Sequence, residues 1–289
     1  MKELALIAAL RRMASHPAAR GLADDCAVLE VGNETLILTH DAMAEGVHYL
    51  TGQDPADTAW KLVATNISDL AAKGAEPLGV LLGYMLGADD TRFLAGLEEA
   101  LSHYNAPLLG GDTISGKGPQ VLGLTAIGRA TCRPVPSRAG ARPGDGLWIT
   151  GPVGAAMLGL EALRSGSGDS LAYRRPVALL AEGRMLAPHV TAMMDVSDGL
   201  LLDAARMARA SGVMLAIESS AVPIATPEAR RGEALRWGED YQLLFTAPPD
   251  FQPPVPAHRI GEVLAGGTTP LILDGQGLSE ADGLGYEHR

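Results

Sequence analysis

The sequence predicts an α+β fold made of two α/β-layer domains. Strand-like apolar runs and helix-like amphipathic segments follow one another along the 289 residues, and 47% of the residues are hydrophobic, which is enough to bury a sizeable core. A proline- and glycine-rich stretch with little apolar periodicity, residues 131–146, divides the chain near its middle. We therefore predict an N-terminal domain over residues 1–136 and a C-terminal α+β domain over residues 137–289.

The first half of the chain predicts the order β-β-α-β-α-β-β after an N-terminal helix. Residues 1–16 have Glu3 before an apolar stretch and two arginines after it, which is typical of an amphipathic helix and opposite to the polarity of a secretion signal. Asp54 can cap the next helix, with Pro55 in its first turn and Gly74 at its end. In chain order, strands are expected at 26–31 and 35–40, a helix at 54–74, a strand at 77–86, a helix at 89–104, and strands at 106–112 and 119–130.

The second half continues with the same mixture of elements. Either Ser197 or Asp198 can cap a helix that follows an apolar strand. The expected strands are 147–150, 190–196, 213–218 and 241–247, and the expected helices are 153–164, 174–187 and 198–210.

Composition and charge disfavour several classes of protein. The formal net charge is −11, and basic residues cluster along the chain only as adjacent pairs, which disfavours a nucleic-acid-binding surface. The apolar segment at residues 79–88 is too short to span a bilayer. The two cysteines, Cys26 and Cys132, make neither a disulfide framework nor a zinc motif. We therefore expect a cytoplasmic protein that binds neither nucleic acid nor membranes.

Five short stretches place acidic or amide side chains at the end of an apolar element. Taken singly, an aspartate at such a place is usually a helix cap or a turn former. If these stretches converge in the fold, their carboxylates repel one another, and bound cations are needed to neutralise them. Ligands that are all oxygen atoms favour Mg²⁺ over zinc. The spacing along the chain leaves open whether they converge. The residues are Asp24 and Asp25, Asp41, Asn66 and Asp69, Asp112, and Asp195 with Ser197 and Asp198.

Local spacing adds detail to two of these stretches. Asn66 and Asp69 are three residues apart on a predicted helix and therefore share one face. Asp112 follows two glycines, Gly110 and Gly111, which would allow the backbone to approach a phosphate closely.

Other nucleotide and catalytic motifs are missing. The sequence has neither G-x-x-x-x-G-K-[ST] nor G-x-G-x-x-G after a strand, no kinase-type HRD or DFG, and no G-x-S-x-G. A transition-metal site made by His40, Asp41 and His48 is disfavoured, because the gap between the histidines matches neither helical nor strand spacing.

In their order, the motifs of this chain resemble the thiamine-monophosphate kinase family. That family forms a superfamily with aminoimidazole-ribonucleotide synthetase and selenophosphate synthetase. The resemblance rests on ADDCAVL, THDAMAEGVHY, NISDLAAKGAEPLGVLL, GGDTISGKGPQVLGLTAIG, SRAGARPGD, MMDVSDGLLLD, WGEDYQLLF and GYEH. It covers nearly the whole chain, and EGVH, NISDLAAKGA and GEDYQLLF in this order are specific.

The resemblance implies ATP-dependent phosphorylation of thiamine phosphate to thiamine diphosphate. Transfer is expected to be direct and in line, with several Mg²⁺ ions, ATP as co-substrate and no phosphoenzyme. The resemblance also implies a homodimer in which the mixed sheets of the N-terminal domains join in a barrel, while the C-terminal domain completes the active site. This chemistry needs alignment of two anionic substrates and cations that neutralise phosphate oxygens, which agrees with a dispersed set of aspartates.

The same resemblance gives individual residues their expected roles. The expected metal ligands are Asp24, Thr39, His40, Asp41, Asp69, Asp112, Asp195 and Asp198. The expected ATP contacts are Gly111, Asp112, Arg138 and Ser197, and the expected contacts with thiamine phosphate are His48 and Glu239. Catalysis is expected to depend most on Asp41, Asp69 and Asp112.

Three positions depart from the family pattern. His40 stands where the family usually has threonine, Ala23 replaces a glycine, and Gly283 replaces an aromatic ring that often packs against the substrate. These departures keep other hypotheses open. The other hypotheses are that the chain is a different ATP-using enzyme of the superfamily, a non-catalytic binder of thiamine phosphates or nucleotides, or a metal-dependent hydrolase.

Overall fold

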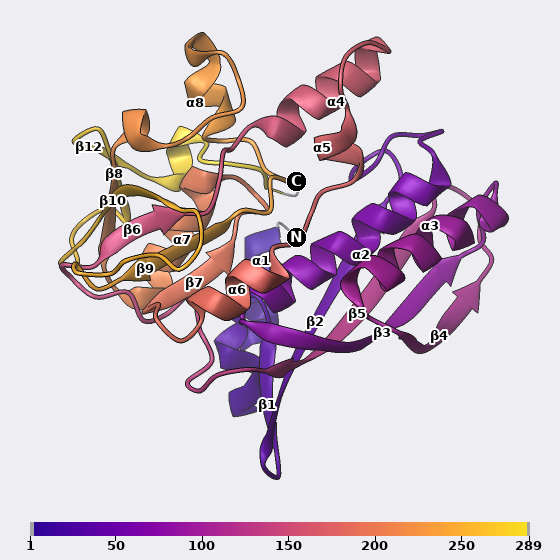
Figure 1. The fold of residues 1–289 in the computed structure, drawn as a ribbon, viewed down its shortest axis with the longest axis horizontal. Helices are drawn as coiled ribbons and strands as arrows, with labels where there is room; N and C mark the ends of the chain where they lie inside the picture. Colours follow the sequence, from indigo (N-terminus) through magenta and orange to yellow (C-terminus); the bar gives the residue numbers. More distant parts are fainter. Residues whose placement is uncertain (1–2, 288–289) are drawn as a thin grey trace.

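The computed structural model describes residues 3–287 and contains two mixed β-sheets with helices packed against them (Figure 1). The first sheet has five strands in the order β1-β2-β5-β3-β4, and the second has seven in the order β12-β11-β8-β10-β6-β9-β7. The boundary predicted between residues 136 and 137 falls in the segment that joins the last strand of the first sheet to the first strand of the second.

The five-stranded sheet comes from the first half of the chain. Antiparallel pairs join β1 to β2, β2 to β5 and β5 to β3, while β3 and β4 are parallel. Two strands extend further than expected, so that Asp41 lies within β2 rather than after a strand, and Asp112 lies inside β4 rather than at its last residue. The strands are β1 (Ala27–Val31), β2 (Glu34–Ala44), β3 (Ala75–Met85), β4 (Leu108–Ile114) and β5 (Val121–Ala130).

Two helices, α2 (Pro55–Ala72) and α3 (Asp90–Tyr104), cover one face of this sheet (Figure 1). The predicted start of α2 is confirmed, because the Asp54 carboxylate accepts the Ala56 N–H at 2.9 Å and Pro55 occupies the first turn. The edge of the sheet remains open. Every residue of β4 is exposed, and Leu109 and Ile114 are each 56% exposed, so this edge is a surface that another chain can cover.

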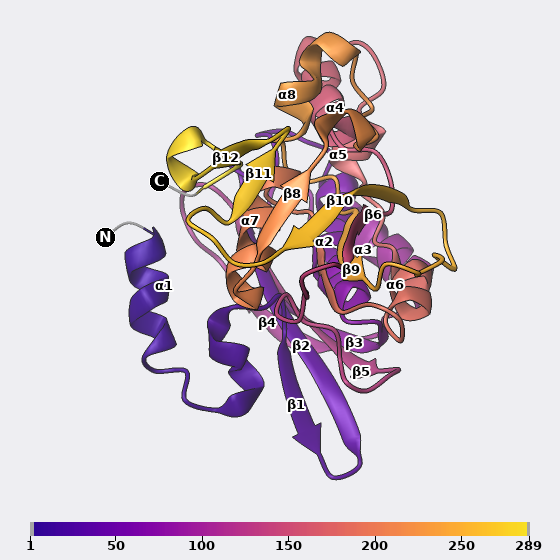
Figure 2. The ribbon, with the colours of Figure 1, turned by 90° about the vertical axis from the view of Figure 1, so that its left-hand side faces the viewer.

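The N-terminal helix α1 (Glu3–Arg11) and the 3₁₀ turn η1 (Pro17–Leu22) lie beside the first sheet, and α1 projects from the body of the molecule (Figure 2). Its exposed apolar side chains include Leu6 and Leu10. The predicted helix began at residue 1, and its first two residues lie outside the described part of the chain.

The seven-stranded sheet belongs to the second half of the chain, and its core is built around α7 (Leu200–Ser211). Its strands are β6 (Gly146–Ile149), β7 (Ala192–Asp195), β8 (Met214–Ile217), β9 (Leu243–Ala247), β10 (His258–Leu264), β11 (Leu271–Leu273) and β12 (Gln276–Leu278). The remaining helices are α4 (Ala155–Ser165), α5 (Leu171–Arg174), α6 (Leu180–Leu186) and α8 (Arg231–Ala234), with short 3₁₀ turns at Ser219–Ala221, Glu228–Arg230 and Glu280–Asp282.

Two expectations for the second half were wrong. The helix predicted over 174–187 is divided into α5 and α6, because Pro176 lacks an N–H and disfavours helical geometry in the residue before it. The cap predicted for α7 is also different. Its N-cap is Gly199, and the buried Asp203 accepts the N–H groups of Asp198 at 3.0 Å and Gly199 at 3.2 Å instead.

The segment around α5 and α6 returns from the second domain to pack on α2. The Trp60 indole N–H donates to the Pro176 carbonyl at 2.8 Å, and the Ala178 N–H donates to the Tyr104 hydroxyl at 3.0 Å. One apolar cluster combines Ala71 of α2 with Phe245 of β9. The two domains therefore share buried surface.

Candidate active site

A cavity of about 660 Å³ lies between the two domains. Its wall combines acidic side chains with aromatic and apolar ones. The acidic residues that line it are Asp24, Asp25, Asp41, Asp69, Asp195, Asp198 and Glu239. The aromatic residues are Tyr173, Trp237, Tyr241 and Tyr286.

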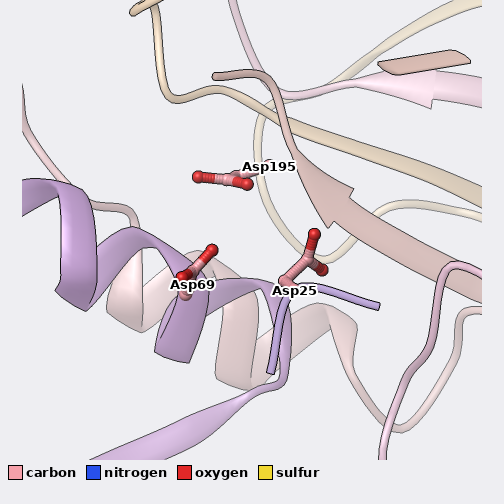
Figure 3. Close-up of side chains that lie close together, drawn as sticks. All are labelled: Asp25, Asp69 and Asp195. Atoms are coloured by element: carbon pink, nitrogen blue, oxygen red, sulfur yellow. The ribbon is translucent and has the colours of Figure 1, made fainter. Parts of the chain in front are cut away.

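Three of these carboxylates converge (Figure 3). Asp25 precedes β1, Asp69 is on α2, and Asp195 ends β7. One oxygen of each lies within 4.8 Å of the others. Three like charges at this separation repel one another strongly in a buried site, so the set is suited to bind a cation.

Burial and mutual repulsion oppose ionisation of these carboxyls. Burial raises the pKa of Asp195 to about 8, and the charge of Asp25 adds to the effect. The pKa of Asp69 is raised well above its ordinary value by burial and then by Asp41 and Asp195. Burial also raises the pKa of Asp41, and the charges of Asp198 and Asp25 add to this effect, whereas His40 opposes it. All the donors are oxygen atoms, which is the chemistry that fits Mg²⁺.

Neutral partners fix the positions of the acidic side chains. The Thr39 hydroxyl donates to Asp69, and the Ser68 hydroxyl donates to Asp195 at 2.6 Å. The Asn66 side-chain carbonyl accepts the Asp41 N–H at 3.0 Å. The prediction that Asn66 and Asp69 share one face of a helix is therefore confirmed, and this face lies against β2.

Asp24 and Asp25 face different partners. Asp24, which was the expected ligand of the pair, is bound by Lys73 at 2.6 Å and by Arg20 at 2.6 Å. Burial alone would raise the pKa of Asp24, but these two cations hold it well below its usual range. Asp25 instead joins the cluster with Asp69 and Asp195. The sequence marked the pair as acidic but carried no signal that distinguished its members.

Two of the expected ATP contacts, Arg138 and Ser197, line the cavity. The Arg138 guanidinium donates to Asp25 from Nε at 2.6 Å and also contacts that carboxylate at 2.5 Å, so it stands beside the carboxylate cluster. Asp198 also lines the cavity and pairs with Arg206. A phosphate bound in this space would meet both a guanidinium and the proposed cations.

The two expected contacts with the organic substrate also meet. Glu239 pairs with the buried Lys61 at 2.5 Å, and Lys61 donates to the His48 carbonyl at 2.9 Å. The Lys61 ammonium group lies 3.8 Å from the centre of the Tyr173 ring. The roles of Lys61 and Tyr173 were not predicted, because an isolated lysine within a helix and an isolated tyrosine carry no motif.

The structure clarifies the departures near the C-terminus. Gly283 has φ +64°, a conformation that favours glycine, so an aromatic residue there would be strained. Tyr286 and Trp237 line the cavity instead. Trp237 belongs to the recognised WGEDYQLLF motif, but no role was predicted for it. His288, which completes the recognised GYEH motif, lies outside the described residues.

The structure does not bring the His40 side chain to the cavity. Side chains alternate along β2, so His40 points to the face opposite that of Asp41, where its Nδ1 lies 2.9 Å from the Thr125 hydroxyl. Thr39 lies on the same side as Asp41 and contacts Asp69.

Gly111 and Asp112 are also separate from the cavity within one chain. Across the sheet, Asp112 of β4 pairs with Gly83 of β3, which pairs with Gly123 of β5, and Gly123 in turn pairs with Ala42 of β2. Three strand spacings of about 4.8 Å put Asp112 about 14 Å from β2. Gly111 has a structural reason to be glycine, because a Cβ there would lie 2.0 Å from the Leu82 carbonyl oxygen.

Within residues 3–287, no helix combines the length and the apolar character needed to cross a bilayer.

The cavity offers carboxylates that suit a cation, a guanidinium that suits a phosphate, and aromatic rings together with the Glu239 carboxylate. This combination suits the joint binding of phosphate groups and a positively charged ring compound.

Comparisons with known proteins agree with this chemistry. The family described as AIR synthase related protein matches with its N-terminal domain over residues 23–130 and its C-terminal domain over residues 142–273. Thiamine-monophosphate kinase of Salmonella typhimurium is 35% identical over 252 residues, covering 79% of this chain and 76% of that protein. The enzyme of the same name from Caulobacter vibrioides is 34% identical over 288 residues, covering 91% of this chain and 81% of that protein. The solved structure of AaThiL complexed with AMPPCP and TMP has a TM-score of 0.88 and 29% identity, covering 100% of this chain and 97% of that chain.

Proposed function

Because this chain belongs to the thiamine-monophosphate kinase family, we propose that it transfers the γ-phosphoryl group of ATP to thiamine monophosphate. The products are thiamine diphosphate and ADP. The observation that carries the proposal is the convergence of Asp25, Asp69 and Asp195 in a cavity that is also lined by Arg138 and aromatic side chains. The protein is proposed to act in the cytoplasm.

The transfer is direct and in line. An oxygen of the substrate phosphate forms a bond to the γ-phosphorus as the bond to the ADP oxygen breaks. No general base is required, because a phosphate monoester with a second pKa of about 6 is already anionic near neutral pH. The chain's task is to align the two substrates and to stabilise charge on the transferred group.

Several Mg²⁺ ions are proposed as cofactors, and the oxygen-only donor set fits them. Bound there, they would supply the positive charge that neutralises phosphate oxygens. The proposed ligands are Asp25, Asp41, Asp69, Asp195 and Asp198, with the Thr39 hydroxyl and the His40 backbone carbonyl beside them. Arg138 and Ser197 contact ATP, while His48 and Glu239 contact thiamine phosphate. Asp24 holds Arg20 and Lys73 in place.

A homodimer is proposed to complete the site. Asp112 and Gly111 lie on the exposed edge strand β4, about 14 Å and three strands from β2, so they cannot reach the cavity of their own chain. The exposed apolar side chains of β4 support the covering of this edge by a second copy. In the dimer, each Asp112 serves the cavity of the other chain, and the N-terminal sheets join in a barrel.

The direct test is product formation. Purified protein is mixed with ATP, MgCl₂ and thiamine monophosphate, and thiamine diphosphate is followed by fluorescence chromatography with and without EDTA. We expect Mg²⁺-dependent thiamine diphosphate in equal amount to ADP. ADP without thiamine diphosphate would instead identify a hydrolase. Binding of both ligands without any product would identify a non-catalytic binder.

Mg²⁺ binding is expected to release protons and to strengthen as pH rises. The metal-free Asp195 carboxyl has a pKa of about 8, so it is largely protonated at pH 7, and a cation binds its ionised form. Below pH 8, release of the Asp195 proton should by itself increase the affinity by up to about tenfold per pH unit. Calorimetric titration of Mg²⁺ at pH 6.5 and 8.5, each in two buffers of different ionisation enthalpy, measures both effects. A pH-independent affinity without proton release would contradict this prediction.

Replacement of Lys61 by methionine is expected to raise the KM for thiamine monophosphate by about tenfold or more, while the KM for ATP stays within about twofold. Lys61 holds the Glu239 carboxylate at 2.5 Å, and its loss frees that side chain from its position. Initial-rate kinetics with each substrate varied in turn measures the two KM values separately. Glu239→Gln should have the same signature, and the double variant should be no worse than either single variant. An equal rise in both KM values would contradict the assignment.

A further inference from the structure

The second fully buried lysine, Lys73, follows the last residue of α2 and stands beside acidic residues of the cavity. Its side chain is 0% exposed. The ammonium group lies 2.6 Å from Asp24, contacts Asp25 and donates to the Met193 carbonyl at 3.3 Å. Two of its three donors have hydrogen-bond acceptors, Asp24 and Met193, whereas Asp25 Oδ2 faces the ammonium group as an ion pair and has no hydrogen-bond partner.

The oxygens of Asp24 and Asp25 are all occupied by protein cations. Lys73 takes one oxygen of each carboxylate. Arg20 takes the second oxygen of Asp24 at 2.6 Å, and Arg138 takes the second oxygen of Asp25 at 2.6 Å. Three cations therefore surround two carboxylates, and this half of the acidic site carries no excess negative charge.

The other half of the site is different. Asp69 and Asp195 accept hydrogen bonds from the hydroxyls of Thr39 and Ser68. Within residues 3–287, no ammonium or guanidinium group forms an ion pair with Asp41, Asp69 or Asp195. The acidic site is thus divided into a half neutralised by the chain itself and a half that depends on an external cation.

We propose that the Lys73 ammonium group is a fixed cation of this site, which neutralises Asp24 and Asp25 in place of one divalent ion. The inference rests on the Mg²⁺ site of the proposed function. It implies that divalent cations are needed beside Asp41, Asp69 and Asp195. It also implies that the Asp25 carboxylate binds both Lys73 and a divalent cation, each through a different lone pair of its oxygens. A compact point charge with three donors suits this bridging role better than a planar guanidinium.

The experiment compares wild-type protein with Lys73→Met in the absence of metal and during a Mn²⁺ titration. Mn²⁺ is the probe, and free Mn²⁺ is counted by electron paramagnetic resonance. Without metal, Lys73→Met leaves buried carboxylates without their cation, so its Tm should fall by about 10 °C. It should bind one more Mn²⁺ per chain than wild type, and saturating Mn²⁺ should return its Tm to within about 3 °C of the wild-type value.

Two further variants sharpen the result. Lys61→Met is the matched control, because it removes the other fully buried lysine, which lies on α2 and pairs with Glu239. It should lose stability without gaining a Mn²⁺ site, and Mn²⁺ should raise its Tm by no more than it raises the Tm of wild-type protein. Lys73→Met combined with Asp24→Asn removes the ammonium group and one carboxylate together, and it should return to the wild-type Mn²⁺ number.

The failures of the two proposals can be distinguished. Wild-type protein that binds no Mn²⁺ would overturn the metal site of the proposed function, and the role of Lys73 with it. Wild-type and Lys73→Met proteins that bind the same number of Mn²⁺ ions would overturn the inference about Lys73 alone. Lys73→Met protein that does not fold even with saturating Mn²⁺ would also overturn it, since a divalent ion should replace the lost charge.

Discussion

A mixed dimer of Asp112→Ala and Asp69→Asn chains is expected to be active although neither variant is active alone. Asp69 serves the cavity of its own chain, whereas Asp112 is proposed to serve the cavity of the partner. In the mixed dimer one cavity carries both substitutions and the other carries neither. Co-expression with two different affinity tags isolates this species. It should form thiamine diphosphate at about half the wild-type rate per dimer.

The control for this experiment is a mixed dimer of Asp69→Asn and Asp195→Asn chains. Both of these residues line the cavity of their own chain, so each cavity in the mixed dimer carries one substitution and no activity should return. If the Asp112 combination were as inactive as this control, the assignment of Asp112 to the partner's cavity would be wrong.

Replacement of Asp69 by asparagine is expected to reduce turnover by about a thousandfold. Asp69 belongs to the carboxylate cluster and is held by the Thr39 hydroxyl, so its charge is central to cation binding. The same change removes one of several repelling charges from a buried site. The metal-free Tm should therefore stay the same or rise, while stabilisation by Mg²⁺ should largely disappear. Product chromatography and thermal unfolding with and without Mg²⁺ measure these effects.

Glu98→Gln on the exposed face of α3 is a suitable control, since it removes a carboxylate far along the chain from the cavity-lining residues. It should retain both turnover and stabilisation by Mg²⁺. An Asp69→Asn protein that kept the wild-type rate would contradict the metal role of this residue. A variant that lost activity only because its metal-free Tm collapsed would contradict it too.

Much of the fold follows from local patterns in the sequence. The start of α2 was predicted because Asp54 and Pro55 are strong local signals, and β1, β2, β3 and β5 were predicted from continuous apolar runs. The single helix predicted at 174–187 was wrong, because the prediction followed the apolar pattern, whereas the proline at position 176 divides the helix. The three strands after residue 257 were missed, and two of them, β11 and β12, have only three residues each and offer no period to detect.

The site was predictable as a set of residue types but not as a geometry. Asp41, Asp69, Asp195 and Asp198 were expected and line one cavity. The choice between Asp24 and Asp25 depends on which carboxylate meets Lys73 and Arg20, and that is a property of packing.

Contacts made by isolated residues were not predictable at all. Lys61 reaches Glu239 across a sequence separation of well over a hundred residues, and Tyr173 joins them from a four-residue helix. The separation of Asp112 from the cavity is likewise a consequence of strand order, which no local motif records.

The return of the segment around α5 and α6 onto α2 has a thermodynamic consequence. The hydrogen bonds from Trp60 to Pro176 and from Ala178 to Tyr104 cross between the domains, and Ala71 and Phe245 lie in one apolar cluster. Neither domain can melt without exposing apolar surface of the other, so the chain behaves as one cooperative unit when heated. These contacts also tie together the two domains that form the walls of the cavity, so loss of the packing between them should disturb the site as well as the fold.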